Sequence, residues 1–243
     1  EVELFTSGTE ECNEFEHAGA FTKSLGLDLK YITFKQDEFL QAFADLIQYI
    51  EHPYSKYLEY LVPIHISHKY LKGRSSKIIS GYGSDILFGG FAKKGMKVSQ
   101  LVRLVWEEYV STYWANEASQ NLGDKFNLDV FYPYLDAGLV ELSFRIDPYL
   151  KNKEDIEKYI LRKAFSEEIT SEIIWRKKVG IHQGTGCEDY FTRYLELTSS
   201  NFSKSKVRGV KDKFAYEILK QVLIDEINPA EIDFAKIKNS LKY

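Results

Sequence analysis

The stretch between Ser80 and Gly90 carries the residue types best suited to chemistry; it reads SGYGSDILFGG and follows a short apolar run. Glycine permits a tight turn and lets the main chain approach a base or a phosphate closely. The same turn holds Tyr82, a phenol that can relay a proton, and Asp85, a carboxylate that can hold a magnesium ion bridging phosphates. Glycine turns followed by an acid also cap helices in structural roles. By itself, the pattern therefore leaves a functional and a structural interpretation open.

A second candidate is the basic run Arg176–Lys178, which lies between the apolar anchor Ile173–Trp175 and the glycine-rich loop Gly180–Gly186. Three adjacent cations on an extended segment cannot all point equally into solvent, so we expect one or two to point inward. A cation in a cleft neutralises polyphosphate and stabilises an oxyanion. A basic surface loop is the alternative.

These residues need a framework, and the first third of the chain predicts one by alternating strands with helices. Apolar patterns predict strands at residues 2–8, 29–34 and 77–80, and helices at about 13–24, at about 37–50, and after the turn at 52–53 up to 70. Such alternation indicates an α/β fold with a parallel sheet. Ligands of such sheets bind outside the carboxyl ends of the strands, which is where the Ser80-Gly81 turn falls.

Beyond Gly90 the pattern becomes mainly helical. Helices are predicted at residues 99–117, after 127–136, at 154–168, at 188–197 and near 214–227. The lysine-rich stretch from Ser203 to Lys213 is interpreted as a solvated loop, because charge runs usually face water. We therefore expect an α/β part over residues 1–92 and a mainly helical part over residues 93–243.

Composition excludes several classes of protein. The 243 residues are 44% hydrophobic and 15% aromatic, enough for a sizeable core. The net charge of -4 shows no basic excess, so a nucleic-acid partner is not expected. The two cysteines, Cys12 and Cys187, have no metal-ligand spacing and indicate a reducing compartment. No apolar stretch approaches the roughly 20 residues that span a bilayer, so we expect a cytoplasmic protein without a membrane partner.

Five segments of the chain together resemble one known family. They read TSGTEECNEFEHA, SGYGSDILFGG, FYPYLD, EKYILRKAF and IIWRKKVGIHQGTG, and they look like the synthetase domain of the asparagine synthetase superfamily, from Val2 to about Phe191. The resemblance implies a twisted parallel sheet flanked by helices, of the Rossmann-like adenine nucleotide alpha hydrolase type. Asparagine synthetases carry glutamate where this chain has Tyr82 and another acid where it has Ile86. Tyrosine in that turn is typical of the β-lactam-forming branch, so the chain most resembles carbapenam and β-lactam synthetases.

The resemblance also implies a reaction. Enzymes of that branch use ATP and Mg²⁺ to adenylate the carboxylate of an amino-acid-derived substrate, a β-amino acid, and release pyrophosphate. They then close a four-membered lactam with the substrate's own amine. An amine is mostly protonated near neutral pH, so ring closure needs a proton acceptor beside it. By the resemblance, Tyr82 and Glu117 help to remove that proton, Lys178 steadies the developing charge, and Asp85 is a magnesium ligand. The expected contacts of ATP are Ser7, Gly8, Ser80, Gly81 and the phosphate-binding Lys158.

Two departures from the family leave alternatives open. The chain lacks the Ser-Gly-Gly-x-Asp-Ser loop that cradles pyrophosphate, so we expect an N-terminal polypeptide segment or a partner subunit to supply the first strand and that loop. A higher oligomer is compatible with this expectation. FYPYLD keeps Asp136, as in asparagine-forming relatives, so an intermolecular amide ligase is the second reading. A noncatalytic partner subunit that retains the nucleotide fold is the third.

Overall fold

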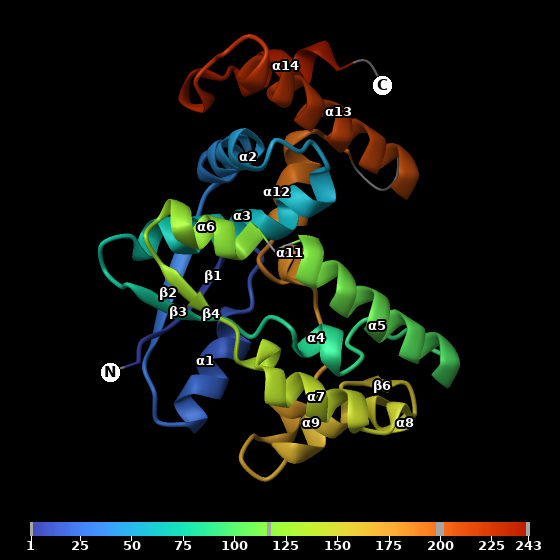
Figure 1. Cartoon of the computed structure of the whole chain (residues 1–243). Coiled ribbons are helices and arrows are strands. Elements are labelled where there is room, and N and C mark those ends of the chain that lie inside the picture. The colour runs from blue at the N-terminus through green and yellow to red at the C-terminus, as the bar shows by residue number, and fades with distance from the viewer. Residues whose placement is uncertain (1, 116–117, 198–201, 242–243) are drawn as a thin grey trace. The chain divides into compact units, whose positions relative to one another are not determined.

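The computed structural model describes residues 2–115, 118–197 and 202–241, and Figure 1 labels its elements. The chain forms two compact units. The first comprises Glu1–Leu71 and Lys178–Tyr243, and the second comprises Lys72–Lys177. Each unit is described by itself.

The first unit is built on a β-α-β element. Strand β1 (Leu4–Thr9) pairs in parallel with β2 (Leu29–Phe34), with Thr9 opposite Phe34 at the carboxyl ends. Helix α1 (Phe15–Ser24) connects the two strands, as a parallel pair requires. Both strands and this helix confirm the sequence prediction.

Helices and a buried aromatic cluster form most of the first unit. Its remaining helices are α2 (Gln36–Ile50), α3 (Ser55–Leu71), α11 (Ile181–Gly184), α12 (Cys187–Tyr194), α13 (Lys204–Leu223), η2 (Pro229–Glu231) and α14 (Phe234–Ser240). The rings of Phe39, Phe43 and Phe191 contact one another, and Phe191 also contacts Phe214 on α13. All four are fully buried, so they tie α2, α12 and α13 into one core.

The lysine-rich stretch from Ser203 to Lys213 is not a solvated loop, and that prediction is wrong. It forms the first half of α13, and the Ser203 side chain caps this helix by accepting from the main-chain N–H of Lys206. One of its cations is buried: Lys211 Nζ lies 2.6 Å from Glu59 Oε1, and both side chains are 5% exposed. A charge run can enter a core when a buried partner of opposite charge accompanies it.

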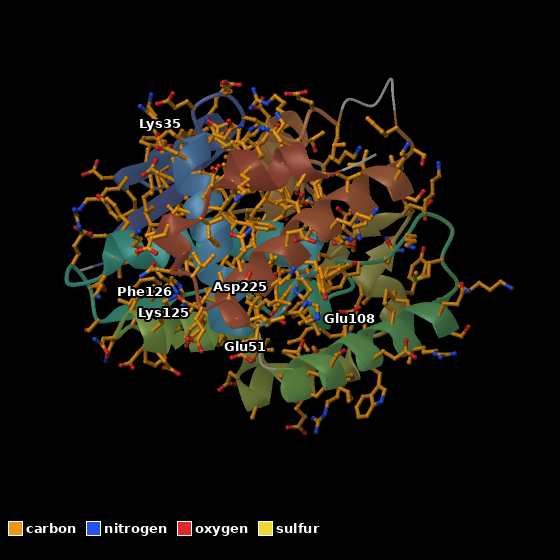
Figure 2. All side chains as sticks on the ribbon, turned by 90° about the horizontal axis from the view of Figure 1, so that it is seen from above. Lys35, Glu51, Glu108, Lys125, Phe126 and Asp225 are labelled. Carbon is orange, nitrogen blue, oxygen red and sulfur yellow. The ribbon has the colours of Figure 1, made fainter. Side chains whose placement is uncertain are left out.

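The second unit contains a shorter parallel pair. Strand β3 (Lys77–Ile79) pairs with β4 (Asp129–Phe131). Its helices are α4 (Ser84–Leu87), α5 (Val98–Ala115), α6 (Ala118–Lys125), η1 (Pro133–Leu135), α7 (Ala137–Arg145), α8 (Pro148–Lys151), α9 (Tyr159–Ala164) and α10 (Ser171–Ile174). Figure 1 shows β3 and β4 side by side, and Phe126, labelled in Figure 2, is buried in the connection from α6 to β4.

The helix predicted over residues 154–168 begins later, at Tyr159. A small antiparallel hairpin precedes it, formed by β5 (Asn152–Lys153) and β6 (Ile156–Glu157). Glu154 and Asp155 at its tip have positive φ angles of 54° and 62°. Left-handed backbone is incompatible with an α-helix, which is why the helical pattern of the sequence fails there.

The observed class is α/β with many helices and small parallel strand pairs, which confirms the coarse fold prediction. The single flanked sheet and the boundary near residue 92 stay predictions. Among the residues that the structure describes, no helix is both long and apolar enough to span a bilayer.

Candidate active site

The turn that follows β3 is fixed by main-chain contacts. The N–H of Ser80 donates to Phe131 O at 2.8 Å, which extends the pairing of β3 with β4 by one residue. Ser80 Oγ then accepts from the N–H of Tyr82 at 3.2 Å. Gly83 has φ 95°, and a Cβ there would lie 2.9 Å from Leu135 Cδ2. The glycine is therefore needed both for the backbone angle and for space, and the turn sets Tyr82 just beyond the carboxyl end of β3.

The phenol of Tyr82 is held against α5. Its oxygen lies 3.1 Å from Thr112 Oγ1, and that hydroxyl donates to the main-chain carbonyl of Glu108, labelled in Figure 2, at 2.9 Å. Either oxygen can be the donor in the first of these bonds. The ring of Tyr132 packs edge-on against that of Tyr82, with centroids 5.8 Å apart. The phenol is thus oriented by a hydrogen bond and by an aromatic wall.

The carboxylate of Asp85 lies on the first turn of α4 and meets a cation from a distant part of the chain. Lys158 Nζ is 3.0 Å from Asp85 Oδ1, and the side chains are 20% and 31% exposed. A Cβ at Gly90 would lie 2.0 Å from the same Oδ1, so glycine makes room for the carboxylate. Lys158 itself has φ 56° and caps α9 in the left-handed conformation. Strained backbone conformations cluster at functional sites, so this conformation is consistent with a functional role for the lysine.

The end of β1 forms a second cluster, in the first unit. Gly8 is buried, and a Cβ there would lie 2.6 Å from Asn13 Cβ, so the turn that leaves β1 packs against this glycine. Asn13 Nδ2 donates to Thr9 O at 2.7 Å and closes the turn. Ser7, one residue earlier, is half-buried.

The glycine loop that follows the basic run is tied to this strand end. The N–H of Thr9 donates to Thr185 O at 2.9 Å. Gly186 has φ 79°, and a Cβ there would lie 2.4 Å from Thr9 Oγ1. Sequence reasoning missed Thr9 and Thr185; the glycines of the loop were the available signal. The first unit therefore joins the carboxyl end of β1 to the segment that begins with Lys178.

The predicted site residues are distributed over both units. The second unit contains Ser80, Gly81, Tyr82, Asp85 and Lys158, and the first contains Ser7, Gly8 and Lys178. Within the second unit, the turn after β3 brings the first four together and the ion pair adds Lys158. Lys178 is half-buried. Glu117 lies outside the described residues. The roles assigned to all of these residues stay predictions.

A magnesium ion would find an oxygen ligand in Asp85. No group of three or more His, Cys, Asp or Glu side chains able to hold a metal occurs in the described part of the chain. Mg²⁺ in nucleotide sites commonly takes one or two carboxylates and completes its shell with phosphates and water. The partly exposed carboxylate of Asp85 fits that use as a single protein ligand.

Comparisons with known proteins point to one family. The family model described as "Asparagine synthase" matches residues 1–127 and 93–228. Carboxyethyl-arginine beta-lactam-synthase of Streptomyces clavuligerus is 25% identical over 241 residues, which are 99% of this chain and 46% of that protein. A probable asparagine synthetase of Schizosaccharomyces pombe is 30% identical, over 63% of this chain and 30% of that protein. Asparagine synthetase B of Escherichia coli is 23% identical, over 89% of this chain and 40% of that protein. The chain spans less than half the length of each of these relatives.

Proposed function

Because the chain belongs to the asparagine synthase family, we propose that it is part of an ATP-dependent synthetase that forms a β-lactam ring. The substrate carboxylate attacks the α-phosphorus of ATP, which gives an acyl adenylate and pyrophosphate. The amine of the same molecule then attacks the acyl carbon, and AMP leaves with its electron pair. The net change in the substrate is the loss of one water, whose oxygen leaves in AMP.

The observation that carries this proposal is the placement of a phenol at the carboxyl end of β3. Tyr82 is oriented by Thr112 and Tyr132, and a fixed hydroxyl of this kind suits proton transfer from an amine. The resemblance pairs it with Glu117 as the final proton acceptor. The similarity to a beta-lactam-synthase over 99% of the chain supports the same reaction class.

Adenylation is assigned to the charged residues. When bound, ATP with Mg²⁺ supplies the leaving groups and the electrophilic phosphorus. Asp85 would hold the metal and Lys158 would contact phosphate, which their closeness supports. Lys178 would stabilise the oxyanion that forms when the amine attacks the acyl carbon. The walls of the adenosine site would be Ser7, Gly8, Ser80 and Gly81.

An intermolecular amide ligase is the second candidate, since several relatives are asparagine synthetases. The sequence feature that favoured it was Asp136. In the structure, this carboxylate caps α7 by accepting from the N–H groups of Gly138 and Leu139 at 2.9 and 3.3 Å. A helix cap is useful whatever the product is, so Asp136 no longer favours the asparagine reaction.

We further propose that a strand and the Ser-Gly-Gly-x-Asp-Ser loop come from an N-terminal segment or a partner subunit. In the described part of the chain, β1 and β3 each pair with a single strand. Parallel sheets normally have more strands and are covered on both faces. Additional strands would extend these pairs toward the Rossmann-like sheet that the family resemblance implies.

The test is to incubate the full-length protein, and any partner it purifies with, with ATP, Mg²⁺ and candidate β-amino acids, following pyrophosphate and product mass. Pyrophosphate release with the loss of one water from a single substrate supports lactam closure. A product that joins two substrates would instead establish the intermolecular ligase. No pyrophosphate with any carboxylate would favour a noncatalytic subunit.

A further inference from the structure

Arg162 on α9 bonds to several groups of the second unit. Its Nε donates to Glu157 O at 2.9 Å, and its Nη2 lies 3.1 Å from a carboxylate oxygen of the same glutamate. Its Nη1 donates to Ile174 O at 2.7 Å and to Arg176 O at 2.9 Å. The residue is 9% exposed, so these bonds are largely shielded from water.

The bonds of Arg162 connect two separate chain segments, and each leads to a predicted site lysine. Glu157 immediately precedes Lys158, whose left-handed backbone must be held in place by its surroundings. Arg176 lies two residues before Lys178, and residues 177–180 form neither helix nor strand. The accepting carbonyls lie at the last residue of β6, at the last residue of α10 and at Arg176, and carbonyls at the end of a helix need donors from outside it.

We propose that Arg162 is a positioning residue that fixes the main chain next to both lysines, Lys158 and Lys178. This inference rests on the proposed function, in which Lys158 contacts phosphate and Lys178 stabilises the oxyanion. Arg162 takes no part in the reaction itself.

The shape of the side chain is essential to this role. A guanidinium is a rigid planar fork with N–H groups in several fixed directions, so it can bond to three carbonyl oxygens and a carboxylate at once. An ammonium group has the same charge but only three donors on a flexible stem. Substitution by lysine therefore keeps the charge, and the attraction to Glu157, while it loses the simultaneous hold on both segments.

The experiment compares Arg162→Lys with the wild type in the full-length protein, using substrate-dependent exchange between ATP and pyrophosphate. Misplacement by about 1 Å can cost about a hundredfold, so we expect kcat to fall at least about tenfold. The matched control is Arg145→Lys, since Arg145 is an exposed arginine of the same unit that pairs with Glu141 four residues earlier. The control should keep wild-type kinetics.

A combined variant separates positioning from general folding. If Arg162 acts through the two lysines, then adding Arg162→Lys to a protein that carries both Lys158→Met and Lys178→Met should slow product formation no further. Independent, multiplicative losses in this combined variant would overturn the proposal, as would wild-type kinetics in Arg162→Lys.

Hydrogen–deuterium exchange distinguishes failure of this inference from failure of the proposed function. In Arg162→Lys, faster exchange should be confined to the peptides that cover residues 157–158 and 174–178. Unchanged exchange there, or faster exchange throughout the unit, would refute the positioning role even in a protein without synthetase activity. Confined exchange changes in a protein that releases no pyrophosphate would instead refute only the proposed function.

Discussion

Asp85 and Lys158 form an ion pair in which Oδ1 and Nζ are 3.0 Å apart. The two groups have different expected partners during the reaction, because Asp85 is assigned to magnesium and Lys158 to phosphate. Both side chains are mostly buried, so each charge compensates the other, and removing one alone would leave an uncompensated charge. In the proposed reaction, a magnesium–nucleotide complex would replace this pair by supplying Mg²⁺ to Asp85 and phosphate to Lys158. The pair would compensate both charges until that complex binds.

The first prediction concerns the metal. Asp85→Asn should raise the Mg²⁺ concentration needed for half-maximal pyrophosphate release by at least about tenfold, because a neutral amide is a weaker ligand than a carboxylate. The measurement is a magnesium titration at saturating ATP. Asp124→Asn, an exposed acid of the same unit, is the control. An unchanged magnesium requirement in Asp85→Asn would remove Asp85 from the metal site.

The second prediction separates the two chemical steps. Tyr82→Phe keeps the ring that packs on Tyr132 but removes the hydroxyl that bonds to Thr112. Exchange between ATP and pyrophosphate should remain near the wild-type rate, while lactam formation should fall by about a hundredfold or more, the usual contribution of proton transfer. Tyr149→Phe, at an exposed tyrosine of the same unit, should change neither rate. Equal loss of both steps would show that Tyr82 serves binding or folding instead.

The sequence predicted the first strands and helices of the first unit well, because local signals agreed there. Alternation at residues 29–34 and helical spacing after Asp37 match β2 and α2 nearly residue for residue. It failed where tertiary contacts override composition. The burial of Lys211 depends on Glu59, which is distant in sequence, and no local sequence pattern predicts such a pair. The hairpin before α9 depends on left-handed residues at Glu154 and Asp155. Aspartate is a common turn residue, but glutamate is not, so the local helical pattern concealed the turn.

The candidate site shows the same difference between local sequence signals, which predict structure, and contacts between distant segments, which they do not. Motif reasoning identified the turn with Tyr82 and Asp85, since glycine spacing and residue type are local. The resemblance predicts Lys158 as a phosphate contact, but its pairing with Asp85 requires two distant segments to meet, which no local motif encodes. Motif reasoning missed Arg162 altogether, because a single arginine in a helical pattern looks like a surface residue until its bonds to three main-chain carbonyls are seen.

The third prediction tests whether Asp136 is only a helix cap. Serine also accepts hydrogen bonds at an N-cap, whereas alanine does not. Asp136→Ala should lower the free energy of unfolding by about 1 kcal/mol, and Asp136→Ser should restore most of it with wild-type turnover. Denaturant unfolding and steady-state kinetics of both variants provide the measurement. A turnover defect in the stable serine variant would show that the carboxylate contacts substrate and would revive the intermolecular reaction.

The fourth prediction uses a buried lysine of the second unit. Lys151 is 3% exposed, and its Nζ lies 5.6 Å from the centroid of the Phe144 ring. Burial lowers the pKa of Lys151 from 10.5 to about 8. Between these values the unfolded chain binds more protons than the folded chain, so stability should rise as the pH increases from about 8 to 10.5. Below about pH 8 the buried charge makes the folded state less stable than an uncharged side chain would.

Lys151→Met should relieve this cost, because methionine matches the length of the stem and carries no charge. Its midpoint of thermal unfolding should exceed that of the wild type at pH 7, and the difference should shrink toward pH 10.5 as the wild-type amine becomes neutral. Lys94→Met, at an exposed position of the same unit, should leave the pH dependence as it is in the wild type. The opposite outcome would be a Lys151→Met variant that is less stable than the wild type at pH 7 and whose unfolding midpoint changes with pH as the wild type's does. The Lys151 ammonium would then be well accommodated beside Phe144. The cation would then stabilise the unit through its contact with the ring, and no proton would be lost on folding.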